Sequence, residues 1–231
     1  MNWNIIGWFL VVACSAVGQT PAPAVRTTLL PVSIGGNVEH LYFRSGDKVL
    51  PFEAYQLGFG PGIDYSGSRR FVLHTSSAAF DVPPPGPVPK AFADLPPNAD
   101  KVLVLCVPEE GGKLRLVPYD ISRNGAKAGD YRIFNLSYHT LSVIIGEKKL
   151  VLKPAEDKTL SEQSWGTGVR DMKFQLATVS GTTATKVYSS IWGHQPAKRN
   201  FIFLVAGRTA TMPIEILKFH DVPAADIPPA E

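Results

Sequence analysis

The chain has 231 residues, a net charge of +3 and a charged fraction of 19%, which allows one large domain or two domains of about 100 residues each. Its basic residues form isolated pairs rather than a patch, so we expect no nucleic-acid binding, because phosphate backbones require clustered positive charge. The 20 glycines and 20 prolines are spread along the chain and favour strands and turns over long helices.

The amino terminus predicts export. Its apolar stretch, Ile5 to Ala13, is too short to span a bilayer, and the small residues Ala16 and Gly18 suit cleavage before Gln19. The letters VVAC offer a second route, since they resemble a bacterial lipobox that would make Cys14 the lipidated first residue. We therefore expect a periplasmic or secreted protein, either free or lipid-anchored to a membrane, with no transmembrane span in the mature chain.

Strands and turns follow the leader. A β-branched run covers Thr27 to Ile34, and Leu41 to Glu53 predicts a hairpin around Gly46. The glycine-rich stretch Gly58 to Gly67 reads as a loop, because no helix follows it to form a phosphate site. The prolines of Asp81 to Pro97 exclude a central strand and predict an extended surface loop.

The stretch Lys101 to Asp120 predicts a strand buried on both faces, a turn, and an alternating strand with one face in water. Cys106 lies in the buried part, "VLVLCVP". If Cys14 is removed or lipidated, Cys106 has no cysteine to pair with. We expect a free, buried thiol here that acts as a small apolar side chain, rather than a nucleophile or metal ligand.

The second half of the chain repeats this pattern. Gly146 in the hairpin Ser142 to Pro154 lies 100 residues after Gly46, and Met172 to Ser180 matches Arg69 to Ser77. Asn200 to Asp221 likewise matches Lys101 to Asp120. Three matches in the same order predict an internal duplication.

These elements predict an all-β fold of two tandem antiparallel β-sandwich units, Ig-like or prealbumin-like. The expected boundaries are a signal peptide at 1–18, a proline-containing spacer at 19–25, units at 26–121 and 126–221, and a flexible tail at 222–231. The alternative is one larger sandwich made of two related halves.

Residues with catalytic chemistry do not form a familiar motif. The five histidines lack the spacing of metal pairs, and the chain contains no HExxH motif, paired cysteines or calcium loop, so we expect no metal and no cofactor. It also lacks a GxSxG elbow. A site assembled from distant strands stays open, and a hydrolase with an unfamiliar site near His194 is one hypothesis.

Two tryptophans give the sharpest binding hypothesis. Trp165 lies in a turn-rich segment, and Trp192 lies at a strand end with His194 close by. An exposed indole beside polar groups can stack on a sugar ring, which predicts a carbohydrate-binding module with a glycan as its partner. The same residues can instead cover the open end of a sandwich core, and we favour that role.

One stretch resembles a known group of proteins. "GDYRIFNLSYHTLSVIIGEKKLVLKP", Gly129 to Pro154, is similar to the opening of exported bacterial β-sandwich domains of unknown function, and Asn37 to Phe52 echoes its hairpin. The resemblance implies an exported sandwich and brings no catalytic residues. Together with the leader, it predicts a non-catalytic structural or binding module of the cell envelope, with an envelope protein or a glycan as its partner.

Overall fold

The computed structural model describes residues 24–56, 58–83, 85–122, 126–162, 171–209 and 211–221. Within these ranges the chain forms strands and two short 3₁₀ turns, Ser77–Asp81 and Glu110–Gly112, and contains no α-helix. The predicted all-β class is therefore confirmed.

Eight of the described strands come from the first half of the chain. They form a sheet in the order β4-β1-β7-β8 and two pairs, β2-β3 and β5-β6. The backbones of Tyr42 and His74 exchange hydrogen bonds of 2.8 and 3.0 Å, which joins the pairs in the order β3-β2-β5-β6. The strands are β1 Ala24–Ser33, β2 Val38–Ser45, β3 Lys48–Ala54, β4 Ile63–Ser68, β5 Arg70–Leu73, β6 Ala91–Asp94, β7 Lys101–Glu109 and β8 Lys113–Asp120.

The other eight described strands come from the second half. They form two sheets, in the orders β12-β9-β15-β16 and β11-β10-β13-β14. These orders are those of the first half with each strand number raised by eight. The strands are β9 Tyr131–Asn135, β10 Thr140–Ile145, β11 Lys148–Leu152, β12 Asp157–Leu160, β13 Asp171–Ser180, β14 Thr183–Gly193, β15 Arg199–Thr209 and β16 Met212–Asp221.

Strand direction also agrees between the halves. Neighbouring strands are antiparallel except β1 with β7 and β9 with β15, which are parallel. The expectation of purely antiparallel sheets is therefore wrong at one pair in each half. Parallel neighbours need a long connection between them, and here the whole set of intervening strands supplies it.

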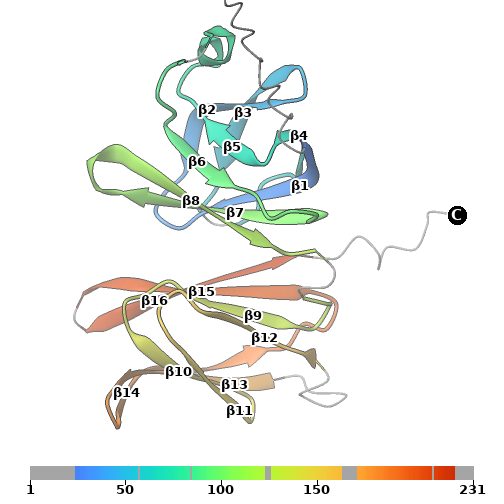
Figure 1. Ribbon diagram of the computed structural model, residues 1–231. Coiled ribbons are helices and arrows are strands. Elements are labelled where there is room, and N and C mark those ends of the chain that lie inside the picture. Colours follow the sequence, from blue (N-terminus) through green and yellow to red (C-terminus); the bar gives the residue numbers. More distant parts are fainter. Residues whose placement is uncertain are drawn as a thin grey trace, which may run out of the picture.

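The sheets lie in four layers, with the first half above the second in Figure 1. One apolar cluster fills each half, and a third, contributed by β1, β7, β9, β15 and β16, fills the space between the halves. Strand β7 therefore has two buried faces: Val102, Val104 and Cys106 face inward, while Leu103 and Leu105 face the second half. This explains its uninterrupted apolar run and confirms the predicted buried strand.

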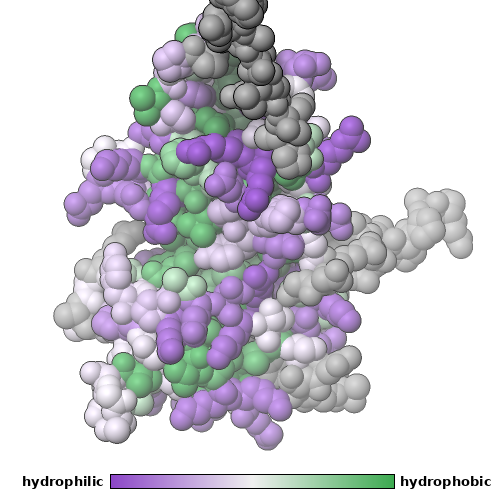
Figure 2. All heavy atoms as spheres, in the orientation of Figure 1, coloured by the Kyte–Doolittle hydropathy of each residue, from purple (hydrophilic) through white to green (hydrophobic). Residues whose placement is uncertain are grey.

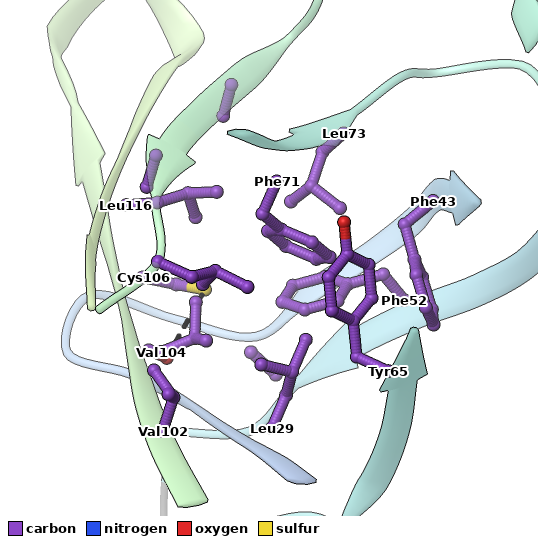
Figure 3. Packing of buried hydrophobic residues seen from close by; sticks show 14 of the residues in the cluster. Leu29, Phe43, Phe52, Tyr65, Phe71, Leu73, Val102, Val104, Cys106 and Leu116 are labelled. Carbon is purple, nitrogen blue, oxygen red and sulfur yellow. Dashed lines mark hydrogen bonds between the residues drawn. The ribbon is translucent and has the colours of Figure 1, made fainter. Parts of the chain in front are cut away.

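The core of the first half is rich in aromatic rings (Figure 3). Phe71 lies 5.6 Å from Phe43 and 5.8 Å from Phe52, measured between ring centroids, and Tyr65 meets it edge-on at 5.4 Å. The Tyr65 hydroxyl donates to the carbonyl of Ser68, so its polar end is satisfied at the edge of the core.

Cys106 lies in this core with no exposed surface, as predicted. Burial raises the pKa of its thiol to about 12, so the reactive thiolate is scarce at neutral pH. We expect a Cys14→Ser variant, in which Cys106 is the remaining thiol, to react with a thiol reagent at pH 8 only after denaturant is added. Rapid labelling of the folded variant would contradict this burial, and the denatured sample serves as the control.

Three local expectations are corrected. Strand β1 begins at Ala24, inside the expected spacer, and Val25 is buried. Strand β4 occupies the end of the glycine-rich stretch that reads as a loop, and β6 lies within the proline-rich stretch. Strand β6 is compatible with its proline neighbours because it has four residues and ends the order β3-β2-β5-β6.

The second strand of each closing hairpin is also more covered than expected. In β8, Val117 and Tyr119 pack against the cluster between the halves, and in β16 Leu217 and Phe219 do the same. The face expected in water is therefore partly an internal face. This face is covered because its alternate positions carry apolar side chains, which pack into the cluster between the halves.

An ion-pair network also connects the halves. The Asp221 carboxylate at the end of β16 accepts hydrogen bonds from Arg199 Nη2 and, at 3.0 Å, from Lys101 Nζ on β7. Arg199 Nη1 donates to the carbonyl of Ile121 at 2.7 Å, just after β8. Because the Arg199 side chain is 3% exposed, its charge depends on these partners.

Candidate functional site

The predicted site residues fall in different parts of the molecule. Trp165 and Cys14 lie outside the described residues. Trp192 lies near the end of β14, and His194 follows that strand directly. The structure therefore describes one of the two tryptophans of the binding hypothesis, Trp192.

Trp192 is held between a ring and a charge. The Phe174 ring lies parallel to the indole, with centroids 3.7 Å apart and an interplanar angle of 11°. The Lys218 ammonium lies 4.9 Å from the centroid of the same indole. Because Phe174 covers one face at stacking distance, the ammonium lies over the other face, where it makes a cation–π contact.

His194 is turned inward and is 4% exposed at its side chain. Its Nδ1 lies 3.3 Å from the Tyr131 hydroxyl, and its Nε2 lies 3.6 Å from Glu162 Oε1. Burial raises the pKa of Tyr131 to about 12, so this hydroxyl stays protonated at neutral pH. The three side chains form a local network that fixes the chain after β14.

An apolar groove of about 610 Å³ lies beside Trp192, between β14 and β16. Its floor and walls come from both sheets of the second half, and Figure 2 shows hydrophobic side chains reaching the surface of this half between its two sheets. The lining residues are Tyr188, Trp192, Gly207, Met212, Ile214, Glu215, Ile216 and Lys218. Its volume is in the range of small-molecule sites.

The groove exists because two sheets end side by side without touching closely. Strands β14 and β16 are the last strands of their sheets and approach each other at few positions. In the first half, the corresponding strands β6 and β8 lie against each other. There β6 presents the small, buried residues Ala91 and Ala93, whereas β14 presents Tyr188 and Trp192, whose bulk keeps the sheets apart.

Two charged side chains line the groove, Lys218 and Glu215, and neither forms an ion pair with the described residues. The Lys218 ammonium lies over Trp192 and, at 5.9 Å, over Tyr131. Burial lowers the pKa of Lys218, and the nearby positive charge of Lys198 lowers it further. An anionic group beside the Lys218 ammonium would offset both effects, because it favours the charged form of the amine.

Gly207 shapes one end of the groove, where β15 turns into β16. A Cβ atom at this position would clash with the Met212 carbonyl oxygen. We expect Gly207→Ala to lower the free energy of unfolding by about 1–3 kcal/mol, because backbone must move to make room. Denaturant unfolding measures the loss. Gly193→Ala is the control, since a Cβ there meets nothing within 4 Å; equal effects of the two changes would contradict the clash.

A second hollow, of about 320 Å³, lies between the halves. Tyr138, which is 88% exposed, stands at it, together with Arg115 and Glu215. Arg115 is already paired with Glu109 at 2.7 Å. Neither this hollow nor the groove includes His194 in its lining, so the convergence expected of a hydrolase centred on His194 is not found in either place.

Comparison of the chain with protein-family models and with curated proteins gives no match.

Within the described ranges, no group of three or more His, Cys, Asp or Glu side chains could hold a metal ion, and no helix is long and apolar enough to cross a membrane.

Lys218 and the isoleucines of the groove were not among the predicted site residues. A signal for them exists in the sequence: Ile214, Ile216 and Lys218 alternate, so all three face the same side of β16. Lys218 thus continues this apolar face with a side chain whose end is charged.

Proposed function

We propose that this chain is a non-catalytic, exported binding protein of the bacterial cell envelope, and that the groove between β14 and β16 is its binding surface. One observation carries the proposal: this side of the second half is open and lined mainly by apolar side chains, with Lys218 and Glu215 as its charged residues, while the same side of the first half is closed. The leader and the resemblance to exported β-sandwich domains support the location.

We further propose that the two halves are duplicated β-sandwich units. The identical strand orders and the sequence matches at a spacing near 100 residues support this. The arrangement favours the prealbumin-like alternative over the Ig-like one. In Ig constant-type domains the first strand shares a sheet with the second, whereas here β1 lies between β4 and β7.

The burial of the reactive groups supports a non-catalytic role. Cys106 and Tyr131 have raised pKa values, and His194 is held against Tyr131 beneath the surface. The hydrolase hypothesis would need His194 to reach a substrate. A sugar ring could stack on Trp192 only at the face of the indole that Phe174 does not cover. To do so it would have to displace the Lys218 ammonium. Both are weaker proposals than binding in the groove.

Site-specific photocrosslinking in the native host tests the binding surface. A benzophenone side chain replaces Met212, which lines the groove and is 58% exposed, and in a second variant it replaces Val88, which is 91% exposed and lies in the first half. We expect the Met212 variant to form a discrete adduct with an envelope component and the Val88 variant to form none. Equal adducts, or none from Met212, would overturn the proposed surface.

Intact mass and cell fractionation test the location. We expect a chain that begins at Gln19, or one that begins at a lipidated Cys14 in the membrane fraction. A full-length chain that begins at Met1 in the cytosol would contradict export.

A further inference from the structure

The outer edge of β14 offers backbone hydrogen bonds beside the groove. The Gly146 amide donates to the Lys173 carbonyl at 2.8 Å, so the backbone groups of Lys173 point toward β10. In an antiparallel ladder a residue directs its N–H and C=O to the same side, and the side alternates along the strand. Ile191, the partner of Lys173, and Ser189, the partner of Gln175, therefore direct their amides away from β13, toward the open edge.

This edge lacks the features that usually prevent strand addition. The stretch Tyr188–Gly193 runs in regular register after the bulge in β14 and contains no proline and no charge. The edge strands β8 and β16 each contain a proline, and β6 has four residues. Prolines, charges and short length are the common protections of sheet edges. The unprotected segment lies where the groove opens.

We infer that the groove binds an extended peptide segment of a partner protein, which pairs with β14 at Ser189 and Ile191 and carries alternating apolar side chains and one carboxylate. This inference rests on the proposed function and specifies its ligand. Every second side chain of an added strand points into the groove, toward Ile214 and Ile216. The carboxylate meets the unpaired ammonium of Lys218.

Selection from a displayed library of random decapeptides tests this, with the full chain as bait. We expect the enriched peptides to alternate apolar residues and to contain Asp or Glu. Three variants are then compared for binding of one enriched peptide by fluorescence polarisation: Ile191→Pro, Val151→Pro and Lys218→Gln. Thermal unfolding of each variant confirms that it is folded.

Ile191→Pro removes an outward N–H without breaking the ladder with β13, and should weaken binding by about tenfold or more. Val151→Pro is the matched control on the opposite edge of the same sheet: its carbonyl accepts from Lys158 Nζ, so its backbone also points away from its neighbour. It should leave binding unchanged. Lys218→Gln should weaken binding by about tenfold, because it removes a charge-assisted hydrogen bond.

Failure of the inference can be told apart from failure of the proposed function. If no peptide is enriched, or if Ile191→Pro binds as well as the unmodified chain, strand addition is wrong. An adduct at Met212 in the crosslinking experiment would then still support the groove as the binding surface, with a ligand of another class such as a glycan. Absence of both peptide binding and the adduct would overturn both proposals.

Discussion

Replacing Phe203 by alanine should lower the free energy of unfolding by about 3–5 kcal/mol. Phe203 has no exposed surface, stacks on Phe134 with centroids 4.8 Å apart, and meets Phe219 edge-on at 5.6 Å. It lies in the cluster between the halves, so its loss leaves a cavity that two sheets must close together. Urea unfolding followed by tryptophan fluorescence measures the change.

The matched control is Phe92→Ala. Phe92 is 51% exposed on β6 and packs under the Arg70 guanidinium, so its removal should cost less than about 1 kcal/mol. A Phe203→Ala effect as small as that of the control would mean that the halves do not depend on this cluster for stability.

Replacing Asp221 by alanine should have an effect of similar size, about 3–5 kcal/mol. The change leaves the Arg199 guanidinium buried without its carboxylate and removes the bond to Lys101 in the first half. The expected result is a lower midpoint of denaturant unfolding. The cost arises from the desolvated charge that remains, rather than from the strength of the ion pair itself.

Asp81→Ala is the comparison for this prediction. The Asp81 carboxylate pairs with Arg44 at 3.3 Å, but both side chains are well exposed, at 78% and 44%. Such a pair contributes less than about 1 kcal/mol. If the two substitutions cost the same, the network between the halves is not the stabilising contact that its burial indicates.

The hairpins could be predicted from the sequence because their signals are local. Gly46 and Gly146 adopt φ values of +56° and +57° at the turns, which glycine accepts without strain, and apolar runs flank both turns. The burial of β7 could be predicted equally well from its uninterrupted apolar residues. By contrast, β4 and β12 carry few apolar letters, and their pairing with β1 and β9 depends on strands distant in the sequence.

The candidate site was less predictable, for a physical reason. Trp192 could be singled out from the sequence because tryptophan is rare and large. The groove beside it depends on the distance between the edges of two sheets. That distance follows from Tyr188 and Trp192 on one strand, compared with Ala91 and Ala93 at the corresponding edge of the other half. The two edges can be compared because both halves have the same strand order, so that β14 corresponds to β6.

The shared middle of the molecule has a consequence for the ancestry of the chain. Leu103 and Leu105 of β7, and Phe201 and Phe203 of β15, would be exposed to water if either half existed by itself. A single ancestral half with such a face would associate with a second copy of itself to cover it. Under the proposed duplication, joining two copies in one gene would turn this concentration-dependent pair into a single chain whose halves cannot separate, and would leave one half free to open the edge at which we propose binding.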